Sequence, residues 1–275
     1  MNRGKIGRNT IILTLTNALE PLDYIHAFWE GGAIAFNRVD EWSDIDLYIA
    51  ADDARIEEAF RAVDNALKSL SPIKQKLNVP QTGWEGVSQA FYLLKNTSEY
   101  LLIDLCILKL SSPEKFLAPE IHGNNVFYLN KKGTIKPPRL NKTAFLSKLN
   151  ARLDRLQTRF KMFNNFVQKE LNRTNYLEAT EFYHGITLAT LVELLRMKHH
   201  PLHYDFRMRY IHYELPPETI KTLEHLYFVK DQKDLQQKYG QATKLVNQLI
   251  HEINPKDMER LVKTQKSRAA TTCQQ

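Results

Sequence analysis

The sequence is poor in cysteine and contains no long uncharged hydrophobic run. Its two cysteines are Cys106, in an apolar stretch, and Cys273, in a polar tail, and we expect no disulfide between them. A chain of this size without disulfides is typical of a reducing compartment, so we expect a cytoplasmic protein. The absence of a run of about 18 uncharged apolar residues argues against a transmembrane helix. Polar residues interrupt the apolar stretch near the N-terminus, where we expect an ordinary helix rather than a signal peptide.

The charge is distributed unevenly along the chain. Residues 1–139 carry 16 Lys and Arg against 17 Asp and Glu, a net charge of −1, whereas residues 140–275 carry 22 against 14, a net charge of +8. Such a step in composition predicts a domain boundary near the Lys-Pro-Pro-Arg sequence at 136–139. The alternative is that helices simply carry more lysine. We expect two domains, 1–139 and 140–275.

The hydrophobic periodicity also differs between the two halves. In the first half, 24–29 and 44–51 have strand patterns, 54–70 has helical spacing, and 88–110 is typical of a hairpin. The second half has helical stripes throughout, over 146–163, 177–197, 217–227 and 231–251. These patterns predict an α+β protein, in which a small mixed β-sheet domain with flanking helices is followed by an all-α helical bundle.

Three aspartates in the first half are placed where charges are costly. Asp44 and Asp46 are two residues apart in an apolar strand pattern, so their side chains point the same way. Asp104 stands alone in the apolar run 101–108. Carboxylates brought together there would repel one another unless a cation lay among them, and rigidly held oxygen ligands suit Mg²⁺. The alternative is that Asp44 caps a turn, Asp46 faces solvent and Asp104 pairs with a lysine.

A glycine pair precedes these aspartates. Gly31 and Gly32 follow the apolar strand pattern of 24–29. Glycines at a strand end let backbone N–H groups approach an anion closely, and a helix that follows adds its positive N-terminal dipole. Most Gly-Gly pairs are only turns, but this pair is followed after eleven residues by Ser-Asp-Ile-Asp. The combination predicts a site for a metal-bound phosphate.

The segment GGAIAFNRVDEWSDIDL resembles the signature of the DNA polymerase β-type nucleotidyltransferases, and most closely their bacterial small-molecule branch, which includes aminoglycoside and lincosamide nucleotidyltransferases. The resemblance covers residues 24–108, and beyond residue 140 it rests only on helical character. It implies a nucleotidyltransferase catalytic domain at 1–139 and a helical substrate-binding domain at 140–275. Asp44, Asp46 and Asp104 correspond to the metal ligands, which in this superfamily hold two Mg²⁺ ions.

The resemblance also implies a nucleotide site, with two departures from the usual pattern. The positions that correspond to nucleotide-contacting residues are Gly31, Gly32, Ala33, Arg38 and Ser43. Ala33 stands where the family usually has a serine, and Phe36 stands where it often has an arginine. A backbone cradle for phosphate needs only N–H groups and could survive both changes.

The second half contains a dense polar and aromatic segment, 176–213, which we expect to contribute the acceptor site through Tyr176, Glu181 and His184. Glu181 is our first candidate for a general base and Glu178 the second, although both could be solvated charges. Arg207 and Arg209 are candidates for triphosphate contacts, with ion pairing to Asp205 or Glu214 as the alternative. The histidines of HHPLH at 199–203 do not have the spacing of a zinc site.

Together these features predict a metal-dependent nucleotidyltransferase that moves a nucleoside monophosphate, AMP from ATP, to a hydroxyl of a small-molecule acceptor and releases pyrophosphate. The basic second half disfavours a polycationic acceptor. One alternative is a catalytically impaired nucleotide-binding or protein-partner module of the same fold, motivated by Ala33 and Phe36. Another is a polymerase-like enzyme acting on RNA or protein, but no nucleic-acid motif accompanies the positive charge. We expect neither a membrane nor a nucleic-acid partner.

Overall fold

The computed structural model describes residues 6–80 and 82–264. They form two compact units, residues 6–140 and residues 141–264. None of the described helices has the length and apolar composition needed to cross a membrane. Cys106 is a free, buried thiol in the first unit, whereas Cys273 lies outside the described residues.

The first unit is a six-stranded mixed sheet with flanking helices. Its elements are α1 (Arg8–Leu19), β1 (Ile25–Glu30), η1 (Ile34–Phe36), β2 (Ile45–Ala51), α2 (Ile56–Leu70), β3 (Ile73–Val79), β4 (Val87–Leu94), β5 (Ile103–Lys109), α3 (Pro119–His122), β6 (Val126–Asn130) and η2 (Lys131–Gly133). The strand order is β3-β4-β5-β2-β1-β6, in which β2 and β5 are parallel and all other neighbours are antiparallel. The expected N-terminal helix, the hairpin and the α+β class are confirmed.

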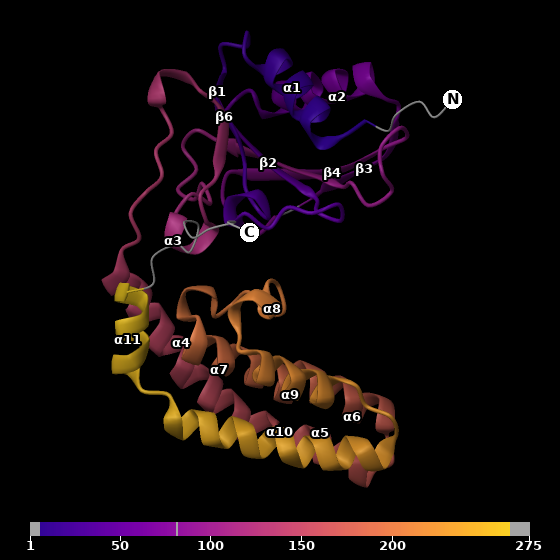
Figure 1. The fold of residues 1–275 in the computed structure, drawn as a ribbon, viewed down its shortest axis with the longest axis vertical. Coiled ribbons are helices and arrows are strands. Elements are labelled where there is room, and N and C mark those ends of the chain that lie inside the picture. The colour runs from indigo at the N-terminus through magenta and orange to yellow at the C-terminus, as the bar shows by residue number, and fades with distance from the viewer. Residues whose placement is uncertain (1–5, 81, 265–275) are drawn as a thin grey trace, which may run out of the picture. The chain divides into compact units, whose positions relative to one another are not determined.

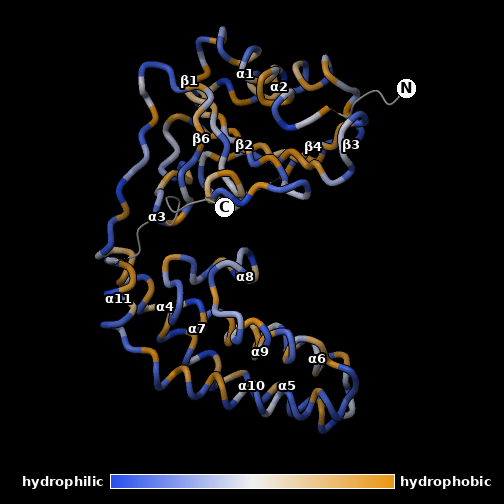
Figure 2. The backbone as a smooth tube through the Cα atoms, in the orientation of Figure 1, coloured by the Kyte–Doolittle hydropathy of each residue, from blue (hydrophilic) through white to orange (hydrophobic). Residues whose placement is uncertain are grey.

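The two faces of the sheet have different roles. Helices α1 and α2 pack on one face (Figure 1), where Ile45, Leu47 and Ile49 of β2 join the main core. Because side chains alternate along a strand, the residues between them project to the other face. That face holds a smaller core, which includes Ala50 and Cys106. Figure 2 shows hydrophobic residues along the central strands and on the helices that cover them. The face of β2 that carries Asp46 is therefore the face away from α1 and α2.

The two edge strands, β3 and β6, were not predicted from the sequence. β3 has the sequence Ile-Lys-Gln-Lys-Leu-Asn-Val and is mostly exposed. It is held by backbone pairing with β4, whose inner residues supply the apolar contacts. A strand at a sheet edge can be polar because only one side and one face meet the core. Such a strand therefore lacks the apolar run on which sequence prediction depends.

The second unit is helical, which confirms the expected all-α C-terminal region. Its elements are α4 (Lys142–Phe163), α5 (Asn165–Asn172), α6 (Tyr176–Phe182), η3 (Tyr183–Leu188), α7 (Ala189–His199), η4 (Pro201–His203), α8 (Ile211–Glu214), α9 (Pro217–Tyr227), α10 (Gln232–Glu252) and α11 (Pro255–Thr264). The α4 stripe is buried at Leu149, Leu153, Leu156 and Phe160. The stripe predicted over 177–197 is interrupted by η3, a π-helical turn. Such turns are frequent at functional sites.

Candidate functional site

Asp46 and Asp104 lie directly opposite each other on two adjacent strands. The register of the parallel β2–β5 pair matches Asp46 with Asp104. Both positions lie on the face of the sheet away from α1 and α2, because the alternate residues of each strand lie in the helix-covered core. Asp44 immediately precedes β2 rather than lying within it, and the Ile45 N–H donates to the Leu102 carbonyl at 2.9 Å. The fold therefore brings Asp46 and Asp104 together on two central strands, with Asp44 just before the first of them. Among the described residues, the three carboxylates do not offer a set of oxygens that all lie within 4.8 Å of one another.

Burial disfavours the ionised forms of Asp104 and Asp44. Burial raises the pKa of Asp104, and the negative charge of Asp44 raises it further, against a hydrogen bond from Gln89 Nε2 at 2.8 Å. Burial also raises the pKa of Asp44. The Cys106 thiol has its pKa raised to about 12 by burial first, and then by the charges of Asp104 and Asp46. These shifts indicate that carboxylate charge is concentrated at this place.

The glycine pair packs directly against this cluster. The Gly31 N–H donates to the Asp46 carbonyl at 2.9 Å. Gly32 has a φ of +63°, and a Cβ built on it would lie 1.8 Å from Oδ2 of Asp46. Only glycine permits both this backbone conformation and this close approach. The turn after β1 thus places backbone beside the Asp46 carboxylate.

The short helix η1 follows the glycine pair. Within the described residues, the Gly32 and Ala33 N–H groups donate to no backbone carbonyl, whereas the N–H groups of Ala35 and Phe36 turn back onto the carbonyls of Gly32 and Ala33. Successive backbone N–H groups that donate to no carbonyl are suited to an anion. The Arg38 guanidinium lies over the Phe36 ring, with Cζ 5.1 Å from its centroid.

Ser43 has a structural hydrogen bond in this arrangement. Its hydroxyl donates to Oδ1 of Asp40 at 2.7 Å, and the Trp42 N–H donates to the same oxygen at 3.1 Å. Asp40, rather than Asp44, is therefore the residue that caps the turn before β2. The alternative in which Asp44 caps a turn does not describe this loop.

Arg8 and Glu30 form an ion pair next to the loop that carries Asp44, and neither residue was predicted from the sequence. The Arg8 guanidinium is ion-paired with the fully buried Glu30 carboxylate, which also accepts a hydrogen bond from the Tyr128 hydroxyl. The same guanidinium donates to the carbonyls of Ser43, at 3.1 Å, and Asp44. Burial raises the pKa of Glu30, opposed by the Tyr128 hydrogen bond and the Arg8 charge. A carboxylate within an apolar strand pattern, such as Glu30, indicates that a positively charged partner lies nearby. Only the tertiary structure identifies this partner as Arg8.

The ligand atoms of the three aspartates are of the type that binds a magnesium ion. The three aspartates offer oxygen ligands only, which are the ligands that Mg²⁺ prefers. Within the described chain, Asp104 is paired with the neutral amide of Gln89 rather than with a lysine or arginine, and its raised pKa reflects burial and carboxylate repulsion. A divalent cation would relieve both costs.

The second unit contains a cavity of about 650 Å³ that gathers three of the predicted residues. It is lined by Glu181, His184 and Arg207, together with an Arg152–Glu193 ion pair and the aromatic side chains of Tyr204 and Tyr227. The volume is that of an ordinary small-molecule site. The His184 ring nitrogens face the carbonyls of Thr180, at 3.0 Å, and Tyr227, at 3.3 Å.

Other predicted residues of the second unit lie outside this cavity lining. Tyr176, Glu178 and Arg209 do not contribute to it. Arg209 stacks on Phe206, with its Cζ 4.2 Å from the ring centroid. Glu214, the alternative ion-pair partner considered for the arginines, instead pairs with Arg196 at 2.6 Å.

A buried polar network surrounds Glu214. Its second carboxylate oxygen lies 2.9 Å from Nδ1 of His203, and the His200 ring stacks on His203 at 4.3 Å. Among the described residues, His200, His203 and Glu214 could offer ligand atoms within 4.8 Å of one another, which the spacing of HHPLH did not predict. The Arg196 guanidinium already neutralises Glu214 and also donates to the Arg207 carbonyl at 2.6 Å. We therefore assign this network a structural role, that of holding the loop after α7.

The network predicts that acid destabilises the helical unit. Burial, followed by the charge of His203, lowers the pKa of His200 to about 4 from 6.5. Between these values the unfolded chain binds a proton that the folded chain does not, so stability falls as pH drops from 6.5 to about 4, by about 3 kcal/mol. His200→Asn should remove most of this dependence. The measurement is urea unfolding followed by helical circular dichroism at several pH values.

A second loss of stability is expected at a lower pH, where Glu214 becomes protonated. Burial alone would raise the pKa of Glu214, but the hydrogen bonds and charges of His203 and Arg196 outweigh it and lower the pKa to about 2 from 4.5. The stabilisation by ionised Glu214 is therefore lost only as pH falls from 4.5 to about 2.

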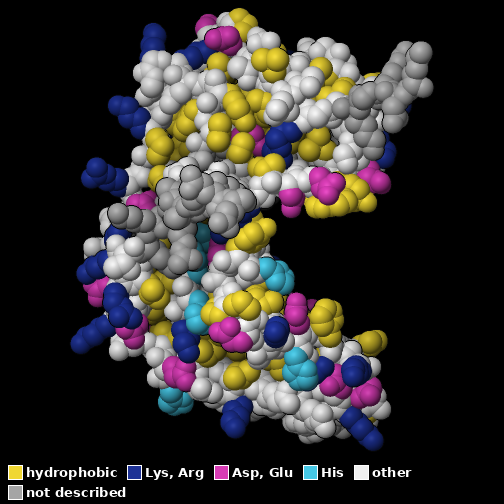
Figure 3. Space-filling model, viewed as in Figure 1, with side chains coloured by type: hydrophobic (Ala, Val, Ile, Leu, Met, Phe, Trp, Pro, Cys, Tyr) yellow, Lys and Arg dark blue, Asp and Glu magenta, His cyan; other side chains and the backbone are white. Residues whose placement is uncertain are grey.

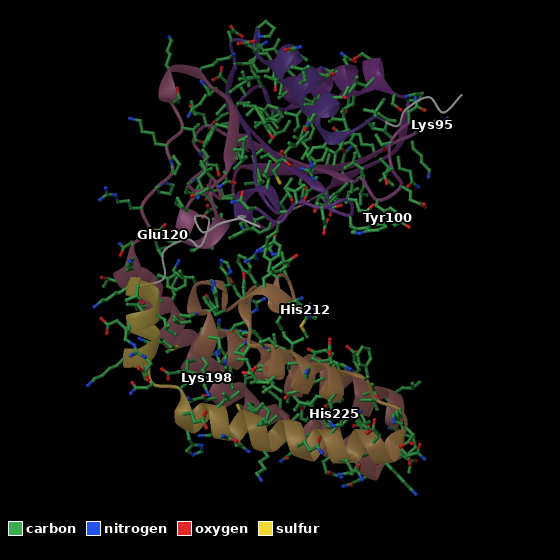
Figure 4. The ribbon with its side chains drawn as sticks, in the orientation of Figure 1. Lys95, Tyr100, Glu120, Lys198, His212 and His225 are labelled. Carbon is green, nitrogen blue, oxygen red and sulfur yellow. The ribbon has the colours of Figure 1, made fainter. Side chains whose placement is uncertain are left out.

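The control for His200→Asn is His225→Asn, a change of the same kind at an exposed position that is labelled in Figure 4. An unchanged pH dependence in His200→Asn would contradict the assignment to His200.

No family model matches the chain. No curated protein matches it significantly either. Two solved structures are similar to it. An aminoglycoside 6-adenyltransferase from Bacillus subtilis has 17% identity over 92% of this chain and 94% of that chain, with a TM-score of 0.31. A STING-associated CdnE c-di-GMP synthase from Capnocytophaga granulosa has 12% identity over 89% of this chain and 81% of that chain, with a TM-score of 0.30. Because these values are low, the geometry of the site itself is the basis for assigning a function.

Proposed function

We propose that the protein is a metal-dependent nucleotidyltransferase that transfers a nucleoside monophosphate, AMP from ATP, to a hydroxyl of a small-molecule acceptor. The observation that carries the proposal is the matched position of Asp46 and Asp104 on parallel strands, with Gly32 packed against the Asp46 carboxylate. Carboxylates next to backbone N–H groups that donate to no carbonyl can hold a metal-bound phosphate.

The residues of the first unit have distinct proposed roles. Asp44, Asp46 and Asp104 would hold one or two Mg²⁺ ions, which when bound polarise the phosphate and neutralise its charge. The N–H groups of Gly32 and Ala33 would bind phosphate oxygens, and Arg38 would add positive charge near the same turn. Gln89 orients the Asp104 carboxylate through its 2.8 Å hydrogen bond. Ser43 acts through Asp40 and shapes the loop that carries Asp44.

The transfer itself is a nucleophilic displacement at the α-phosphorus of the nucleoside triphosphate. A bond forms between the acceptor oxygen and this phosphorus while its bond to the bridging oxygen of the β-phosphate breaks. Pyrophosphate leaves, and the proton of the acceptor hydroxyl goes to a general base. We propose Glu181 as this base because it is an exposed carboxylate that lines the cavity of the helical unit.

We further propose that residues 1–139 form the catalytic domain and residues 140–275 the substrate-binding domain, in a cytoplasmic protein. Arg207, which lines the cavity, is the better candidate for a phosphate contact, because Arg209 stacks on Phe206. The Arg152–Glu193 pair is internally neutralised, so it contributes shape more than charge to the cavity.

The test is pyrophosphate release from each of the four nucleoside triphosphates with Mg²⁺, against a panel of hydroxyl-bearing antibiotics and metabolites. With an acceptor found, Glu181→Gln should lower kcat by about 10²-fold or more, the usual contribution of a positioned general base. Glu178→Gln, one turn away and outside the cavity lining, should stay within about twofold of the wild type. Equal losses in the two variants would remove Glu181 from the mechanism while leaving the metal site intact.

The alternative function is a nucleotide-binding module of the same architecture that no longer catalyses transfer. Two features favour it: Ala33 offers no hydroxyl, and the Phe36 ring lies beneath the Arg38 guanidinium. Calorimetric binding of ATP with Mg²⁺, together with no pyrophosphate release across the whole panel, would select this alternative.

A further inference from the structure

Two large aromatic side chains are exposed on the loops that lead into the catalytic strands. Trp42 precedes Asp44 by two residues, and Tyr100 precedes Asp104 by four. Their rings pack edge to face with centroids 4.9 Å apart, yet Trp42 is 56% exposed and Tyr100 is 53% exposed. Figure 4 labels Tyr100, and Figure 3 shows a hydrophobic patch with acidic side chains beside it at that place. We call Trp42 and Tyr100 the aromatic pair.

The loops that carry the aromatic pair are held in place by hydrogen bonds. On one loop, Oδ1 of Asp40 accepts from the Trp42 N–H at 3.1 Å and from the Ser43 hydroxyl at 2.7 Å. On the other, the Leu101 N–H donates to the Ser98 carbonyl at 3.2 Å. The 2.9 Å bond from Ile45 to Leu102 then ties the two loops together. Rigid, exposed aromatic rings are the usual means of binding a planar ring by stacking, because little entropy is lost on binding.

The position of the aromatic pair follows from the strand order. Along the sheet the order is β5, β2, β1. Asp104 on β5 lies opposite Asp46 on β2, and the Gly31–Gly32 turn after β1 lies on the other side of Asp46. Tyr100 leads into β5, so it lies on the side of the carboxylates away from the glycine turn. In an in-line displacement the attacking and leaving oxygens lie on opposite sides of the phosphorus. If the leaving phosphates bind at the glycine turn, the acceptor approaches from the side of the aromatic pair.

We propose that Trp42 and Tyr100 bind an aromatic or heteroaromatic ring of the acceptor by stacking. This inference rests on the proposed function and specifies its substrate class. The exposed carboxylates of Glu41 and Glu99 flank the two rings in sequence. They disfavour an anionic ring by repulsion, so the ring is neutral or positively charged.

The experiment measures ring binding to the protein saturated with Mg²⁺ and α,β-methylene ATP, whose transfer is blocked. Guanosine, cytidine and 4-hydroxyphenylethanol serve as ring probes and ribose as the probe without an aromatic ring, each titrated by saturation-transfer NMR. At least one ring probe should bind the wild type more tightly than ribose does. Trp42→Ala should weaken that binding about tenfold or more, and Trp42→Phe should retain most of it. The affinity for α,β-methylene ATP should stay within about twofold.

The matched control is Trp84→Ala. Trp84 is 52% exposed and packs edge to face on Phe116 at 5.3 Å. It precedes β4 near Val87, which pairs with Leu108, four residues along β5 from Asp104. Equal losses in Trp42→Ala and Trp84→Ala would overturn the proposal, as would the absence of ring binding to the wild type. A tenfold loss of α,β-methylene ATP affinity in Trp42→Ala alone would assign the pair to the nucleotide's base and overturn the acceptor assignment.

The outcomes separate this proposal from the proposed function. If Asp46→Asn abolishes pyrophosphate release while Trp42→Ala leaves the KM of the acceptor unchanged, nucleotidyl transfer stands and the aromatic pair is not an acceptor site. If the wild type binds no α,β-methylene ATP, the proposed function fails. The ring titrations of the unloaded wild type and Trp42→Ala then decide whether the pair binds rings at all.

Discussion

Asp46→Asn is expected to lower pyrophosphate release by at least about 10³-fold, because the loss of a proposed metal ligand removes several kcal/mol of stabilisation from the charge that develops on the phosphate oxygens. Asp46 lies opposite Asp104 in the β2–β5 register and against Gly32, so its carboxylate is central to the cluster. The amide keeps the shape of the side chain and removes the charge. The readout is the initial rate of pyrophosphate release with Mg²⁺ and saturating triphosphate.

Asp53→Asn is the matched control for this substitution. Asp53 follows the far end of the same strand, where its carboxylate accepts hydrogen bonds from Ser111. This variant should keep its rate within about twofold, because the change is of the same kind but lies away from the cluster. Because mutual repulsion is relieved, Asp46→Asn should unfold at a urea concentration no lower than the wild type. Full activity of Asp46→Asn would refute the metal assignment.

Gly32→Ala should be nearly as damaging to activity, with a loss of at least about 10²-fold. The added Cβ would lie 1.8 Å from Oδ2 of Asp46, so the carboxylate must rotate or the turn must shift. Either movement displaces a ligand by about 1 Å or more, and misplacement of that size in an active site costs about 10²-fold. The measurements are pyrophosphate release and the Kd of α,β-methylene ATP with Mg²⁺.

Gly133→Ala separates this contact from backbone strain. Gly133 has a φ of +62°, close to the +63° of Gly32, but a Cβ there would meet no atom within 4 Å. Both substitutions place alanine in the left-handed region, which costs about 1–2 kcal/mol. The expected result is that Gly133→Ala shows the backbone strain alone and keeps its activity, whereas Gly32→Ala is destabilised at least as much in urea and loses activity. Normal activity in Gly32→Ala would mean that the approach of Gly32 to Asp46 has no role in catalysis.

The local sequence determined the class of the fold and the identity of the carboxylates. The spacing of Asp44 and Asp46 predicted that their side chains point the same way, since strand geometry has a period of two residues. The helical stripes predicted the all-α second region for the same kind of reason. Strand β3 escaped prediction because it buries too little apolar surface to leave such a pattern.

The tertiary structure alone decided how distant residues meet. The register that sets Asp46 opposite Asp104, the hydrogen bond from Gln89 and the Arg8–Glu30 pair all join residues that are far apart in sequence. The same holds for the collection of Glu181 and Arg207 at one cavity, from which Tyr176 and Arg209 are excluded. Local patterns record which face of an element is buried. They do not record which neighbour it meets, because that depends on strand pairing and side-chain packing between segments separated by long stretches of chain.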